Sequence, residues 1–547
     1  MLRYKVFGRH HRKEQSKLAE HNFDYIIVGG GSAGCIVAAR LVEESDASVL
    51  LVEAGEQAER NPDTLSADGF KYCFANDNVM WDRMSERQAN CGNRPMYVGT
   101  GTGMGGSGSV NGMVYTPGDK RDFAQWPDNW KWDDIAPTFE KLTQRLDVRH
   151  REGTAFTEIA LDAAETIGFK RKNDMIDGEI GGFMGYNAMN FRDDERRSSY
   201  VSFLKGEVHP KLTIVTQARA SRVLFEDKHA VGIEYVLNGK KLIAKAAKEV
   251  VLTAGALQTP KLLMLSGVGP KAHLAANGIT VVHDAPSIGE NLQDHTNVCM
   301  FLNGKKPIDF GYPQVYGFER FNPDLDLPDD TQPDTCIAML SAPITVQQSM
   351  YRMVPATLLP PKLFGNKYLR KIIRLLIDGV FAIPKVKKLV ANTYGIVVIL
   401  GKPTSRGRLR LASGHYDDEA LIDPNYYAND EDLQTMLNGV IKAKAMAKTD
   451  SLKEWGSRLL LPPTKSNNPE TLKKWIKTAS MTTFHFCGTC SMGEEDQYPV
   501  NTDLSLKGMT GLRIADASVI PVIPVSALNA PSMMIAYRAA DFILAKQ

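Results

Sequence analysis

The chain has 547 residues, a formal net charge of +2 and 43% hydrophobic residues, which is an ordinary composition for a globular protein. This length exceeds what a single hydrophobic core supports, so we expect two or more closely joined domains. The nearly neutral charge provides no global positive field, and we therefore expect no nucleic-acid partner.

Residues 1–22 are basic but contain no apolar stretch, so the start of the chain does not resemble a secretory signal. No segment reaches the roughly 18 uncharged apolar residues that a membrane span needs. The seven cysteines are too sparse for a disulfide framework, and the lone C-x-x-C pair, Cys487 and Cys490, favours packing over a zinc or redox site. We therefore expect a cytoplasmic protein without a metal site.

The first predicted elements form a strand–turn–helix–strand unit. Phe23–Val28 is a short apolar run typical of a buried parallel strand, and it leads directly into the glycine-rich turn 29–34. Residues 35–44 follow with the pattern of a helix, and residues 48–55 with that of a second strand. A glycine-rich turn in this setting is typical of a dinucleotide-binding site.

The turn contains the pattern G-x-G-x-x-G, made of Gly29, Gly31 and Gly34 with Ser32 and Ala33 between them. Gly29 permits the tight turn, Gly31 lets the backbone approach a pyrophosphate, and Gly34 allows close packing of helix on strand. The helix N-terminus directs unpaired N–H groups at the anion. Glu53 lies about 20 residues further on, where an acid accepts the ribose hydroxyls of adenosine. A packing turn without a ligand is the alternative, and the pattern alone does not separate FAD from NAD.

Further motifs follow in the rest of the chain. They are GTGMGGSGSVNGMVYTPG at 101–118, GALQTPKLLMLSGVG at 255–269, IGENLQDH at 288–295, HFCGTCSMG at 485–493, GLRIADASVIP at 511–521 and NAPSMMIAYRAADFI at 529–543. In their order these motifs resemble those of the glucose–methanol–choline (GMC) oxidoreductases, from residue 22 to the end of the chain. Thr102 departs from the family, which usually has Arg or Lys at that position.

The resemblance implies an α/β fold, α+β overall, with a Rossmann-like FAD-binding domain and a second domain of antiparallel sheet plus helices for the substrate. We expect the FAD-binding domain to comprise residues 22–144, 215–304 and 481–547. The substrate domain then comprises residues 145–214 and 305–480. The cofactor implied is FAD, held without a second nucleotide.

The resemblance also implies cofactor contacts beyond the first turn: Gly105, Ser109, Asn111, Asp516 and Ala517. Asp516 matches a residue near the pyrophosphate and ribityl chain, and an ordinary turn acid is its alternative. Val223 matches the strand position whose backbone meets adenine, or else belongs to the sheet core. Some members bind the flavin covalently through a histidine where this chain has Val110, so we expect non-covalent FAD.

His485 matches the catalytic histidine of the family, and histidine suits proton transfer because its pKa lies near neutrality. The family usually adds a second polar residue, but this chain has Ala527 there; Asn529 matches a further asparagine of many dehydrogenase members. We predict oxidation of a primary or secondary alcohol, in which His485 accepts the hydroxyl proton and a hydride passes to flavin N5. Oxygen, a quinone or another acceptor would then take the electrons.

Ala527 leaves other interpretations open. In the first, Asn529, a water molecule or the substrate itself supplies the second polar group. In the second, the protein is a flavoenzyme of another class, a lyase or a fatty-acid photodecarboxylase. In the third, it is a catalytically idle flavoprotein.

One segment outside these motifs, 351–390, contains nine lysines and arginines but a single acid, Asp378. Apolar residues interleave with the basic ones, and residues 367–381 have the pattern of a basic amphipathic helix. This composition is typical of a helix that lies on an anionic membrane surface. It predicts association with the inner face of a membrane and a hydrophobic alcohol as substrate. A solvated helix with its apolar side in the core is the alternative.

Overall fold

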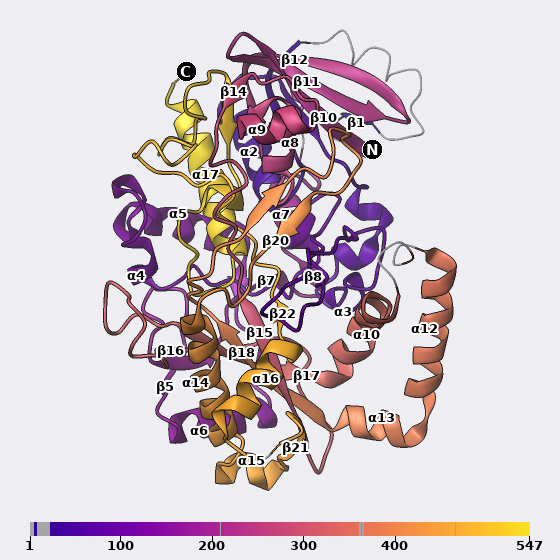
Figure 1. The fold of residues 1–547 in the computed structure, drawn as a ribbon, viewed down its shortest axis with the longest axis vertical. Coiled ribbons are helices and arrows are strands. Elements are labelled where there is room, and N and C mark those ends of the chain that lie inside the picture. Colours follow the sequence, from indigo (N-terminus) through magenta and orange to yellow (C-terminus); the bar gives the residue numbers. More distant parts are fainter. Residues whose placement is uncertain are drawn as a thin grey trace.

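Two large β-sheets organise the chain, and each combines segments from distant parts of the sequence. The computed structural model describes residues 5–7, 22–207, 209–359, 363, 366–464 and 466–546. Figure 1 shows the first sheet in the upper half of the molecule, near both labelled chain ends, and the second sheet in the lower half. This arrangement confirms the predicted α/β class with a Rossmann-like part and an antiparallel part.

The first sheet has eight strands, of which the central ones are parallel. Its order is β1 (Lys5–Phe7), β9 (Leu212–Val215), β3 (Val49–Val52), β2 (Asn22–Val28), β12 (Lys240–Leu252), β11 (His229–Leu237) and β10 (Ala218–Glu226), and β23 (Leu512–Ile514) pairs with the end of β12. Strands β10, β11 and β12 form an antiparallel meander. Strands β2 and β3 are rich in Val, Ile and Leu and are largely buried, as expected for parallel strands covered on both faces.

Helix α2 (Ser32–Glu44) follows β2 and packs against α17 (Asn529–Leu544), the last helix of the chain. Small residues on both buried faces, mostly alanines, let the two helices approach closely. Arg40 of α2 also forms an ion pair with Asp541 of α17 at 2.7 Å. The pairing therefore brings the C-terminal segment onto the glycine-rich turn, although 497 residues separate Ser32 from Asn529 in the sequence.

The second sheet also has eight strands and is mainly antiparallel. Its order is β21 (Arg458–Leu461), β15 (Thr296–Asn303), β18 (Thr393–Leu400), β17 (Thr335–Ser341), β16 (Val315–Glu319), β6 (Phe183–Tyr186) and β5 (Lys170–Lys172), and β22 (Met481–Thr482) pairs with β15. Helix α14 (Asp430–Met446) packs on β17 and β18, and α6 (Ala155–Thr166) packs on β5 and β6. This part of the chain therefore has the predicted antiparallel sheet with helices.

Shorter elements connect the two sheets. The remaining strands are β4 (Val148–Arg149), β7 (Met189–Arg192), β8 (Glu195–Arg196), β13 (Val268–Gly269), β14 (His283–Asp284), β19 (Arg408–Arg410) and β20 (Leu421–Asp423). The remaining helices of the body are α3 (Phe70–Cys73), α4 (Lys120–Phe123), α5 (Trp132–Arg145), α7 (Ser199–Phe203), α8 (Thr259–Leu265), α9 (Lys271–Ala276), α15 (Asp450–Trp455) and α16 (Pro469–Ala479).

Three strands lie on the other side of the expected domain boundaries. β15 and β22 pair with each other in the second sheet, whereas we expected residues 296–303 and 481–482 in the FAD-binding domain. β9 pairs with β3 in the first sheet, whereas residues 212–214 were expected in the substrate domain. The physical reason is that a strand belongs to the sheet whose neighbours it hydrogen-bonds, and the spacing of motifs does not encode that partner.

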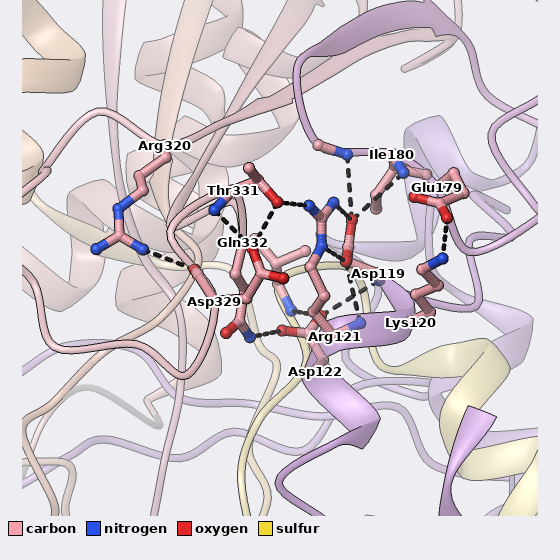
Figure 2. Close-up of polar contacts among 12 residues, drawn as sticks. Asp119, Lys120, Arg121, Asp122, Glu179, Ile180, Arg320, Asp329, Thr331 and Gln332 are labelled. Atoms are coloured by element: carbon pink, nitrogen blue, oxygen red, sulfur yellow. Dashed lines mark hydrogen bonds and ion pairs between the residues drawn. The ribbon is translucent and has the colours of Figure 1, made fainter.

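A buried ion pair joins segments from both parts of the molecule. The carboxylate of Asp122 accepts a hydrogen bond from Lys402 Nζ at 3.0 Å, and both side chains are buried. The amide of Gln332 also donates to Asp122, at 2.9 Å (Figure 2). In the same figure the neighbouring Asp119 accepts two hydrogen bonds from the Arg121 guanidinium. Burying a charge without a partner is costly, so this network holds the second sheet in a defined position relative to the first.

The basic segment extends from the second sheet as three helices. They are α10 (Ala342–Leu358), α12 (Lys367–Ala382) and α13 (Pro384–Ala391). Figure 1 shows α12 and α13 at the edge of the molecule, with α10 between them and the body. None of the helices in the described ranges is long and apolar enough to cross a membrane.

Candidate active site

A cavity of about 610 Å³ lies between the two sheets. Its walls include the ends of β2 and β3 in the first sheet and residues of β17 and β18 in the second. The carboxyl ends of parallel strands are where ligands bind in open α/β sheets, because the following loops and helix N-termini converge there. His485, Ala527 and the glycine-rich turn all line this one cavity.

The three glycines of the turn have different surroundings. A Cβ atom on Gly29 would lie 2.7 Å from the carbonyl of Thr253, and Gly29 has a φ of +106°, so packing and backbone both require glycine. A Cβ atom on Gly34 would lie 1.9 Å from the carbonyl of Gly29, which explains the close packing of α2 on β2. At Gly31 the nearest atom would be 3.8 Å away. Packing within the protein therefore does not require glycine at position 31. A ligand that approaches the backbone closely does require it.

The N-terminus of α2 carries no side-chain cap, so the amides of its first turn remain available to an anion. Glu53 lines the same end of the cavity and is held by three backbone N–H groups, those of Gly30, Gly55 and Gly103, at 2.7 to 2.9 Å. Oε1 accepts two of these bonds and Oε2 accepts one, so a lone pair of Oε2 remains for a ribose hydroxyl. These features fit the nucleotide part of FAD.

The second glycine-rich segment supports the first. Asn111 lines the cavity, and its amide oxygen accepts hydrogen bonds from buried Arg196 at 2.7 Å and from a backbone N–H. Gly105 and Ser109 do not line the cavity; the Gly105 N–H donates to the carbonyl of Gly30, and the Ser109 hydroxyl donates to a carbonyl within its own loop. Their position indicates that they shape the loop, whereas the adjoining residues 106 and 107 line the cavity.

Asn529 begins α17, and its amide oxygen accepts a hydrogen bond from the Ser32 hydroxyl at 3.1 Å. The same oxygen lies close to Gly108 of the second glycine-rich segment. The structure therefore places Asn529 beside the cofactor loops and in the wall of the cavity that His485 also lines, and its role as a catalytic partner of His485 stays a prediction. Ser32 and Ala33 line the cavity beside it.

Asp516 and Ala517 line the cavity as predicted, and Val223 does not. The Asp516 carboxylate accepts hydrogen bonds from the Gly255 N–H and the Thr259 hydroxyl. These bonds connect the motif at 511–521 to the motif at 255–269. The N–H of Val223 donates to the Ser266 hydroxyl at 2.8 Å, and its side chain is buried in the sheet. A bulge in β10 separates Val223 from residues 218–220, which reach the cavity in its place.

His485 contacts a second histidine that the sequence motifs did not assign a role. The Nδ1 atoms of His485 and His295 are 3.0 Å apart. The Thr483 hydroxyl donates to the His295 carbonyl, so its oxygen is left to accept from His485 Nδ1, also at 3.0 Å. The Thr483 oxygen therefore favours the proton of neutral His485 on Nδ1, and His295 Nδ1 is then the acceptor in its contact with that N–H. The lone pair on Nε2 is then free for a group in the cavity, which His485 lines.

Burial lowers the pKa of His485 to about 4, so its imidazole is neutral near pH 7 and able to accept a proton. Buried His295 likewise has a lowered pKa, first because of desolvation and then because of His485. Asp294 fixes the backbone here, because its carboxylate accepts from the His485 N–H at 2.7 Å and from the Thr482 hydroxyl at 2.5 Å. Burial raises the pKa of Asp294 to about 7.

The motif IGENLQDH was visible in the sequence, but no role for Asp294 or His295 could be derived from it. Only the pairing of β15 with β22 brings these residues beside His485. Cys487 and Cys490 are buried, and desolvation raises the pKa of both thiols, as in packing cysteines. Across the described ranges, no group of three or more His, Cys, Asp and Glu side chains is arranged to hold a metal ion.

Much of the cavity wall away from the glycine-rich turn is apolar. It includes Phe74, Met80, Met339, Leu340, Val397, Ile399 and Phe484. Val110 and Ala527 also line the cavity. An apolar wall next to one polar acceptor is typical of a small-molecule site that binds a largely hydrophobic ligand.

A Rossmann-like sheet, a glycine-lined nucleotide cradle and a neutral histidine in one cavity define a dinucleotide-binding oxidoreductase. Residues 23–297 and 403–536 match the N-terminal and C-terminal parts of the family described as GMC oxidoreductase. The chain therefore belongs to the GMC oxidoreductase family, whose cofactor is FAD, and the residues of the cradle fit that cofactor.

Relatives match nearly the whole chain. The alcohol dehydrogenase [acceptor] of Pseudomonas putida is 30% identical and covers 96% of both chains. The choline oxidase of Arthrobacter globiformis is 32% identical over 96% of this chain and 95% of its own. The structure is similar to that of a pyridoxine 4-oxidase from Mesorbium loti, with a TM-score of 0.80, 27% identity, and coverage of 95% and 99% of the two chains.

Proposed function

We propose that the protein oxidises a primary or secondary alcohol and that His485 accepts the hydroxyl proton. The observation that carries this proposal is a neutral imidazole whose Nε2 is free and which lines the same cavity as the nucleotide cradle. The names of the relatives, an alcohol dehydrogenase and a choline oxidase, support the class of reaction. FAD, when bound, supplies a two-electron acceptor for the hydride.

The protein's own residues would perform the proton chemistry. An alcohol releases hydride readily only while its hydroxyl proton is leaving, so a base must lie within hydrogen-bond reach of that proton. Neutral His485 can accept it on Nε2 while Nδ1–H stays bonded to Thr483 and His295. The resulting imidazolium is stabilised by these two acceptors, while Asp294 holds the backbone in place.

The wall of the cavity supports a hydrophobic alcohol. Ala527 offers no second polar group, so the substrate hydroxyl would be held by His485 together with Asn529, a water molecule or a polar group of the substrate. We further propose that FAD is bound without a covalent link, since Val110 presents no nucleophilic atom to the cavity. The flavin should therefore leave the chain on denaturation. We leave oxygen, a quinone or another final acceptor open.

The proposal is tested by anaerobic reduction of the bound flavin with short-chain, long-chain and aromatic alcohols. Replacement of His485 by Ala should slow reduction by about 10²- to 10⁴-fold, as expected for the loss of a general base, while FAD content stays normal. Reduction at the wild-type rate in the variant would refute the role of His485. A flavin that no alcohol reduces would favour the lyase or photodecarboxylase alternative, for which Ala527 is the supporting residue.

A further inference from the structure

The outer face of α12 is apolar, which is the reverse of an ordinary surface helix. A surface helix normally turns its apolar stripe to the core and its charges to water. Here the side chains of Tyr368, Ile372, Leu375, Leu376 and Val380 are 48 to 83% exposed. Their spacing of three or four residues places them on one face, and Ile383, exposed by 48%, continues it into α13.

The arginines of this segment are turned inward and are not available to an external partner. Arg370 binds Asp77 at 2.8 Å and Asp82 at 2.6 Å, and buried Arg352 of α10 binds the same two carboxylates at 3.0 and 2.9 Å. Arg374 lies 3.4 Å from Asp77. The helix expected over residues 367–381 is present as α12, and two of its arginines, Arg370 and Arg374, join Arg352 of α10 in fastening the segment to the body.

The lysines remain as the external charges. Five of them are exposed and form no ion pair within the described part of the chain: Lys367, Lys371, Lys385, Lys387 and Lys388. The nearest acid of the segment, Asp378, accepts hydrogen bonds from Gln347 and Tyr351. An exposed apolar row flanked by lysines matches the chemistry of an anionic bilayer, where apolar side chains enter the headgroup boundary and lysines meet the phosphates.

We propose that the outer face of α12 and α13 docks on an anionic lipid bilayer and that the enzyme takes a long-chain alcohol dissolved in it. The second part of the proposal rests on the proposed function. The docking helices are fastened to a wall of the cavity, because Asp77 and Asp82 flank Met80 and Trp81, which line it. Met353 of α10 packs against the cluster that contains Met80. Ion pairs and packing thus connect the docked face to the apolar wall.

Flotation with lipid vesicles tests the docking. The full-length holoenzyme should float with vesicles of phosphatidylserine and phosphatidylcholine, and should stay at the bottom with phosphatidylcholine alone. Leu376→Asp should abolish flotation, and Lys387→Gln with Lys388→Gln should weaken it by about fivefold per lysine removed. Ile243→Asp, at a residue 47% exposed on β12, is the matched control and should float like the wild type.

Two results would overturn the docking. One is a wild type that never floats. The other is a Leu376→Asp variant that floats as well as the control, because an aspartate cannot enter the bilayer boundary without a large cost. Sedimentation velocity adds a third outcome. A wild-type dimer that Leu376→Asp converts to monomer, with no flotation, would show that a second copy of the chain covers this face.

Substrate delivery is tested separately. With vesicles present, Leu376→Asp should reduce its flavin at least tenfold more slowly with 1-dodecanol and at the wild-type rate with soluble 1-butanol. Equal rates for both alcohols would overturn delivery from the bilayer and leave docking intact. If the wild type reduces its flavin with neither alcohol, the proposed function fails, whereas the flotation result is unaffected.

Discussion

The contact between His485 and His295 makes the sharpest prediction about catalysis. Replacing His295 by Leu removes the acceptor 3.0 Å from His485 Nδ1 and leaves the Thr483 oxygen as the remaining one. One hydrogen bond contributes about 0.5–1.5 kcal/mol net, which corresponds to a rate loss of about 2- to 13-fold if the bond holds the reactive tautomer. The loss should appear in the limiting rate of flavin reduction, because His295 does not line the cavity and acts through His485.

The measurement is anaerobic stopped-flow reduction of the flavin at saturating alcohol, with FAD content and melting temperature as controls. His295→Gln provides a matched variant, because its amide oxygen can accept from Nδ1 and should restore part of the rate. A structural role alone would lower the melting temperature of both variants without separating their rates. A Leu variant that reduces its flavin at the wild-type limiting rate would refute the tautomer assignment.

Three further predictions concern the cradle, the domain contact and pH. Gly31→Ala should leave the melting temperature of the apoprotein unchanged but lower the FAD content of the protein. Gly34→Ala should lower the melting temperature itself, because its Cβ atom would lie 1.9 Å from a carbonyl. Equal effects of the two variants would contradict the assignment of Gly31 to the nucleotide cradle. Asp122→Asn should lower the free energy of unfolding in urea by about 3–5 kcal/mol, because Lys402 would keep its buried charge without a counter-ion. A loss under about 1 kcal/mol would show that this ion pair does not hold the second sheet against the first. Burial lowers the pKa of His485 to about 4, so its imidazole is neutral at higher pH. The limiting rate of flavin reduction should therefore be level from pH 8 to 6 and fall below pH 4. A fall centred near pH 6.5 would contradict a pKa lowered by burial.

The sequence by itself determined the nucleotide half of this protein. The strand, the G-x-G-x-x-G turn, the helix and Glu53 are consecutive in the chain, so their geometry follows from local rules of turns and helix termini. The motifs in the family's order then indicated FAD and the place of His485, and the family comparison confirms the family and cofactor. His485 lines the cavity as expected from its motif.

Tertiary structure decided the features that depend on contacts between distant segments. His295 and Asp294 meet His485 only because β15 pairs with β22, and Asn529 faces Ser32 only because α17 packs on α2. Val223 lies beyond a bulge in β10 and does not line the cavity, which residues 218–220 reach. On α12 the sequence showed basic and apolar residues in alternation. Asp77 and Asp82, some 290 residues away, form ion pairs with the arginines on the inner side of the helix, and the apolar row is therefore exposed. Local pattern fixes which side chains share a helix face, whereas the partner that each face meets is set by packing and charge pairing across the whole chain.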